Sequence, residues 1–137
     1  MKSQSSHSRP RVIASGVAVV FGILTIASGG RALFGGAAAQ AAAGDAVPFV
    51  LWFNFLSGFA YVLAGFGIAM GRRWAVAFSI ALVAAIAVVF ALFGLHVYQG
   101  SAFEMRTVGA MTLRLLVWIA ITAVAIQCAA AGGPKEN

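Results

Sequence analysis

Four apolar runs, each long enough to cross a lipid bilayer, dominate the sequence. A helix of about 20 residues rises about 30 Å, which matches the hydrocarbon core of a membrane. Backbone polar groups have no water to bind there, so such runs must form helices or a closed barrel. We therefore predict an all-α polytopic membrane protein, a bundle of four transmembrane helices at about residues 12–33, 48–70, 75–97 and 108–130.

The composition excludes the common soluble classes. Hydrophobic residues make up 62% of the chain and charged residues only 9%, whereas soluble domains carry about a quarter charged residues. The formal net charge of +6 would suggest nucleic-acid binding in a soluble protein. Here the basic residues lie between apolar runs and form no solvated basic face. We expect the lipid bilayer, and no nucleic acid, as the partner.

Two polar segments flank the apolar part of the chain. Residues 1–11 are Ser-rich and basic, and residues 132–137 follow a Gly-Gly-Pro stop. We expect a disordered cytoplasmic tail over residues 1–11 and a short cytoplasmic tail over residues 132–137. The first apolar run is too long for the core of a signal peptide, so we interpret it as an uncleaved first span.

The distribution of lysine and arginine predicts the orientation. If the chain crosses four times, only Arg31 and Arg106 lie near one face, and the excess of basic residues marks the cytoplasmic face. Both termini are then cytoplasmic, in a bacterial-type inner membrane, with Asp45, His96 and Glu104 outside. The residues on the cytoplasmic side are Lys2, Arg9, Arg11, Arg72, Arg73 and Lys135.

Small residues recur at helical spacing in three of the spans, which favours close helix contact within the bundle or in a homo-oligomer. The second span adds polar side chains to such a stripe, and the Ala-rich loop at residues 34–47 is compatible with a short interfacial helix. The predicted faces are Ala14, Ala18 and Gly22; Asn54, Ser57, Gly58, Tyr61 and Gly65; and Ala77, Ala81 and Ala85.

Arg114 is the most informative polar residue. It lies about six residues into the fourth predicted span, so about 9 Å below the outer interface, where an unpaired arginine is costly and usually faces the bundle or a cavity. Asn54 has the same predicted depth. One hypothesis is an outward-opening pocket with ligand-binding candidates Arg114, Asn54, Tyr61, Arg31 and Arg106. The alternative is that Arg114 snorkels upward and binds loop carbonyls, Glu104 or Asp45, tying the helices together.

The remaining candidates for chemistry lie between the third and fourth spans. His96 and Glu104 could form an acid–base set, because histidine titrates near neutrality and a carboxylate can orient it. His96, Met105 and Met111 would suit copper by ligand softness, but their spacing is loose and we predict no metal site. Cys128 is the only cysteine, so an intrachain disulfide is excluded. No phosphate-binding loop, nucleophile elbow or zincin motif occurs.

Two stretches resemble the DoxX-like group of small four-helix bacterial membrane proteins. G-I-L-T-I-A-S-G-G-R-A-L-F-G (22–35) is similar to the group's first helix, and N-F-L-S-G-F-A-Y-V-L-A-G-F-G-I-A-M-G-R-R-W-A (54–75) to its glycine-rich second helix; Gly132-Gly133-Pro134 matches a terminal turn. Asn54 stands where the group often has glutamate. The resemblance implies an accessory or quinone-linked redox subunit, with quinone as the possible cofactor.

We therefore expect a non-catalytic accessory subunit or a binder of a small ligand, quinone-like or an anionic lipid, in the outer leaflet. One alternative is a redox-linked enzyme component that transfers protons through His96 and Glu104. A second alternative is a small transporter, for which four spans would need to dimerise.

Overall fold

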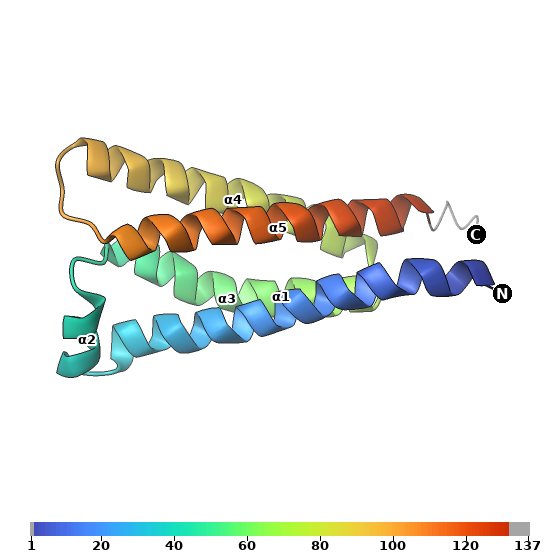
Figure 1. The fold of residues 1–137 in the computed structure, drawn as a ribbon, viewed down its shortest axis with the longest axis horizontal. Coiled ribbons are helices and arrows are strands. Elements are labelled where there is room, and N and C mark those ends of the chain that lie inside the picture. Colours follow the sequence, from blue (N-terminus) through green and yellow to red (C-terminus); the bar gives the residue numbers. More distant parts are fainter. Residues whose placement is uncertain (1, 132–137) are drawn as a thin grey trace.

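The computed structural model describes residues 2–131, with side chains from residue 9 to 130. Four long helices lie side by side, and one short helix lies across an end of the bundle (Figure 1). All four long helices are long and apolar enough to cross a membrane. The predicted all-α four-helix membrane bundle is thus confirmed. The helices are α1 (Lys2–Phe34), α2 (Ala37–Ala43), α3 (Pro48–Ala69), α4 (Arg73–Tyr98) and α5 (Met105–Ala131).

The two ends of the bundle differ in content. At one end α1 begins, α5 ends and a tight turn joins α3 to α4; we call this the terminal end (Figure 1). At the other, the loop end, α2 and the α4–α5 connection at residues 99–104 lie close together. Pro48 opens α3, where its missing N–H costs nothing. Gly71 closes the α3–α4 turn in a left-handed conformation (φ 67°), which only glycine adopts freely.

The tightest helix pair is α1 with α3, because small residues let the two backbones approach. A Cβ atom added to Gly22 would lie 2.8 Å from the carbonyl oxygen of Gly58, and one added to Gly65 would lie 3.1 Å from that of Ser15. Ala14 and Ala18 are buried beside them. The predicted small-residue faces of the first two spans therefore meet each other.

The predicted alanine face of the third span does not pack inside the bundle. Ala77 and Ala81 are exposed, and α4 instead packs through a face that carries larger side chains. Dispersion and packing favour the face with the greater contact area, and Leu82, Ile86 and Phe93 supply more of it than alanine. The buried residues of α4 are Ala75, Ser79, Leu82, Ile86 and Phe93.

The first helix starts earlier than predicted. We expected a disordered tail over residues 1–11, but α1 extends back to Lys2 and contains Pro10. Extending a helix that an apolar span has already nucleated costs little per residue, so polar residues can continue it. The predicted tail at 132–137 lies outside the described residues. The short helix that the Ala-rich loop allowed is present as α2.

Candidate functional site

Arg114 is buried inside the bundle, with 7% of its surface exposed. It lies nine residues after Met105, where α5 begins, so about 13.5 Å along the helix from the loop end. The helix α5 begins three residues before the predicted Val108. An arginine this far along an apolar helix is costly unless it is paired or faces the bundle or a cavity.

The Arg114 guanidinium has weak partners only. Its Nη1 donates to the sulfur of Met111 at 3.8 Å, and its Cζ lies 5.9 Å from the centre of the Phe21 ring. Its Nε is buried and has no hydrogen-bond acceptor. Within residues 2–131, no hydrogen bond or ion pair joins Arg114 to Glu104, Asp45 or a loop carbonyl. The tether geometry that the sequence allowed is absent from the described part of the chain.

Aromatic side chains complete the surroundings of Arg114. Tyr61 and Trp118 are fully buried, and their ring centroids are 4.8 Å apart. The ring centroid of Phe21 lies 5.9 Å from that of Tyr61. We call Phe21, Tyr61, Met111, Arg114 and Trp118 the arginine cluster. Three helices contribute to it, because Phe21 lies on α1 and Tyr61 on α3.

The arginine cluster holds an excess of unsatisfied hydrogen-bond donors. Arg114 Nε, Tyr61 Oη and Trp118 Nε1 are buried without a partner. The hydroxyl of Ser57, one turn from Tyr61, donates to the carbonyl of Asn54 at 2.9 Å. Buried polar groups are nearly always paired, and each orphan costs about 1–3 kcal/mol. All three groups can donate to a hydrogen-bond acceptor.

Asn54 does not join the arginine cluster. Its Oδ1 is buried and unpartnered, but it lies seven residues before Tyr61, about 10 Å nearer the loop end. Among the described residues, no hydrogen bond links Asn54 to Arg114. Arg114 and Tyr61 instead share a neighbour, because both lie against the Phe21 ring.

The charged residues at the loop end bind the α2 segment instead. A carboxylate oxygen of Glu104 accepts a hydrogen bond from the backbone N–H of Asp45 at 2.8 Å. Arg106 Nη2 donates to the carbonyl of Ala42 at 2.7 Å. We call these two contacts the loop clasp. Arg31 is exposed at the end of α1, about 15 Å along the helix from Phe21.

His96 lies apart from Glu104. Its ring is 6.1 Å from that of Phe49 in an edge-on arrangement, and no described contact joins it to Glu104. The predicted acid–base set is thus not assembled in this arrangement of the chain. Within the described residues, no group of three His, Cys, Asp or Glu side chains is placed to hold a metal ion.

Met111 and Trp118 lie three residues before and four residues after Arg114, on the same face of α5, and both are fully buried. Sequence reasoning did not identify Phe21. The rotation of α1 against α5 decides which α1 side chain meets Arg114, and the periodicity of one span does not report that rotation. The signal available was depth, because Phe21 lies near the middle of α1's apolar run.

The comparisons with known proteins give no relative. No family model matches the chain, and no curated protein or solved structure is significantly similar to it.

Proposed function

We propose that this small integral membrane protein is a non-catalytic ligand-binding subunit whose recognition group is Arg114. The ligand presents acceptor oxygens to the arginine cluster, as a quinone-like carbonyl or an anionic head group does. Arg114 supplies charge and a planar set of N–H donors, while Tyr61 and Trp118 supply one neutral donor each. A quinone, where it binds, would supply redox chemistry.

The burial of Arg114 without a carboxylate partner carries this proposal. A charged side chain inside a bilayer costs several kcal/mol unless it is paired, and such residues commonly mark sites of function. Both carboxylates of the described chain, Asp45 and Glu104, lie at the loop end and contact each other's segment. An acceptor from outside the chain would give the buried Arg114 Nε a hydrogen-bond partner.

The resemblance to the DoxX-like group supports the quinone-like version, because the group is associated with quinol oxidation. A place in a membrane redox complex, the bacterial inner membrane and cytoplasmic termini are parts of the same proposal. The basic residues at the terminal end support this orientation. A homo-oligomer is compatible with the exposed Ala77 and Ala81 of α4.

The test is native mass spectrometry of the detergent-purified protein, with solvent extraction of bound quinones and lipids. Arg114→Met removes the charge but keeps length and flexibility, so we expect a folded protein that has lost the co-purified ligand. Arg31→Met is the matched control, because Arg31 is exposed and distant. Equal ligand content in wild type and Arg114→Met would contradict the proposal.

The alternative function, a redox-linked enzyme component, predicts a different experimental result. Proton transfer through His96 would give a pH-dependent activity that His96→Gln abolishes. Ligand retention at Arg114 should instead be unaffected by His96→Gln, since the ring contacts Phe49 and lies outside the arginine cluster.

A further inference from the structure

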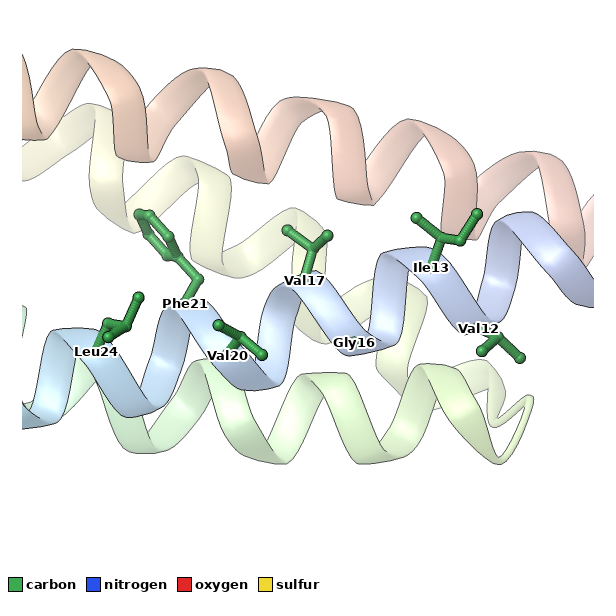
Figure 2. Close-up of a pocket in the computed structure, with 7 residues that line it drawn as sticks. All are labelled: Val12, Ile13, Gly16, Val17, Val20, Phe21 and Leu24. Atoms are coloured by element: carbon green, nitrogen blue, oxygen red, sulfur yellow. The ribbon is translucent and has the colours of Figure 1, made fainter.

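A hollow of about 360 Å³ lies on the outward face of α1 (Figure 2). Gly16 is at its centre, and a side chain added there would meet no atom within 4 Å. Aliphatic side chains surround this gap, and Phe21 lies toward one end of it. The full lining is Val12, Ile13, Gly16, Val17, Val20, Phe21 and Leu24.

The hollow has the length of one lipid leaflet. From Val12 to Leu24 the helix rises about 18 Å, and half of a hydrocarbon core is about 15 Å. It begins near the terminal end and reaches the level of Phe21, whose other contact is Arg114. The hollow therefore lies in the half of the bundle opposite to the loop clasp.

A charged residue stands at the terminal end of the same helix face. Arg9 precedes Ile13 by four residues and Gly16 by seven, spacings that place all three on one side of a helix. Arg9 is exposed. The Arg11 side chain points toward the α3–α4 turn instead, where its Nη1 lies 3.1 Å from the position that a Cβ on Gly71 would take.

The surroundings of Arg9 are positively charged. Arg72 and Arg73 are exposed at the same end of the bundle, and neither carboxylate of the described residues lies there. A cluster of basic residues at a membrane surface attracts anionic lipids, with about 1 kcal/mol for each basic residue. The hollow thus combines an open apolar surface of leaflet length on α1 with a cationic end.

We propose that this hollow binds one anionic phospholipid from the leaflet at the terminal end. An acyl chain lies over Gly16 between the flanking valines, and Arg9 pairs with the head-group phosphate by charge-assisted hydrogen bonds. A second copy of the chain fits less well, since a two-fold axis through this face would bring two Arg9 side chains together. Phe21 lines the hollow and also belongs to the arginine cluster, but the head group would bind at Arg9, and the proposal does not depend on the function proposed above.

Lipid retention by the full-length protein tests the site. The protein is reconstituted in nanodiscs that contain phosphatidylglycerol and phosphatidylcholine with the same acyl chains, and is then released for native mass spectrometry. We expect retained phosphatidylglycerol in wild type. Gly16→Leu fills the hollow, while Gly94→Leu is the matched control, because Gly94 also has open space around it on another helix.

The charge is tested by a second matched pair. Arg9→Gln and Arg11→Gln remove the same charge from the same helix on different faces. We expect Arg9→Gln to lower the retention of phosphatidylglycerol about fivefold and Arg11→Gln to lower it much less. Arg114→Met should leave this lipid in place, which separates this site from the arginine cluster.

Three results would overturn the proposal. Unchanged retention in both Gly16→Leu and Val20→Trp, each checked for folding by circular dichroism, would show that the hollow holds no lipid. Equal losses in Arg9→Gln and Arg11→Gln would show a diffuse surface effect. An oligomer that Gly16→Leu dissociates would assign this face to a second copy of the chain.

Discussion

Glu104 and Asp45 are 59 residues apart in sequence, and the carboxylate of the first accepts the backbone N–H of the second at 2.8 Å. The contact joins the residue directly before α5 to the segment directly after α2. Arg106 adds a hydrogen bond to Ala42. The loop clasp therefore holds α2 across the loop end by interactions that the apolar spans do not supply.

We predict that Glu104→Ala loosens the α2 segment without unfolding the bundle. A partly exposed charge-assisted hydrogen bond contributes about 1 kcal/mol, so amide exchange over residues 37–47 should quicken roughly fivefold. Hydrogen–deuterium exchange mass spectrometry measures this. Asp45→Asn is the control, because its backbone donor is unchanged; an equal loosening in Asp45→Asn would show that the side chain, not the backbone, matters.

Gly44 sits directly under the same carboxylate. Its φ of 61° is left-handed, and a Cβ there would collide with the Glu104 carboxylate. We predict that Gly44→Ala destabilises the segment by about 1–2 kcal/mol from the backbone alone, plus the loss of the hydrogen bond. Gly100→Ala, with a φ of 85° and open space, should show the backbone cost only. In exchange experiments, Gly44→Ala combined with Glu104→Ala should be less than additive, and full additivity would contradict the collision.

The sequence was sufficient for the number of spans because the thickness of a bilayer fixes how long an apolar run must be. The sequence was less informative about where each helix begins and ends. Arg106 was assigned to the loop because it is polar, yet α5 begins at Met105 and includes it. Polar side chains at the head-group level are compatible with helix, so polarity alone misplaces such a boundary.

The choice of packing faces was predictable only where one solution dominates. Gly22 and Gly58 allow a backbone approach that no other face of α1 or α3 offers, and the prediction for these spans held. In α4, alanines at a spacing of four were equally suitable as a packing face, but the buried face is the one that carries Leu82 and Ile86. The position of Phe21 against Arg114 depends on how α1 is rotated, which no single span encodes.

The α1–α3 contact predicts a contrast between two glycines of the same helix. Gly22→Ala should destabilise the protein by about 1–3 kcal/mol, because the new methyl group meets the Gly58 carbonyl at 2.8 Å and overpacking is costly. Gly16→Ala should be neutral or stabilising by up to about 1 kcal/mol through helix propensity. Thermal unfolding in detergent, followed by loss of monodispersity, compares them. Similar melting temperatures for both variants would mean that α1 and α3 are less closely packed than described.

The stability of Arg114 variants distinguishes a ligand-binding role of Arg114 from a role in stabilising the bundle. Among the described residues, the guanidinium contacts the Met111 sulfur and the Phe21 ring, and a cation–π contact is worth about 0.5–2 kcal/mol. Burying an unpaired arginine in a bilayer costs about 2.5 kcal/mol or more. We therefore expect Arg114→Met to be as stable as the wild type or more stable by about 1–2 kcal/mol after ligand and lipid are stripped. Wild type with ligand should regain the difference, and only wild type should respond to added ligand. A sharply lower melting temperature for stripped Arg114→Met would show that the guanidinium supports the bundle. Its removal leaves no charged partner unpaired, so such a loss would have to come from contacts of the guanidinium itself.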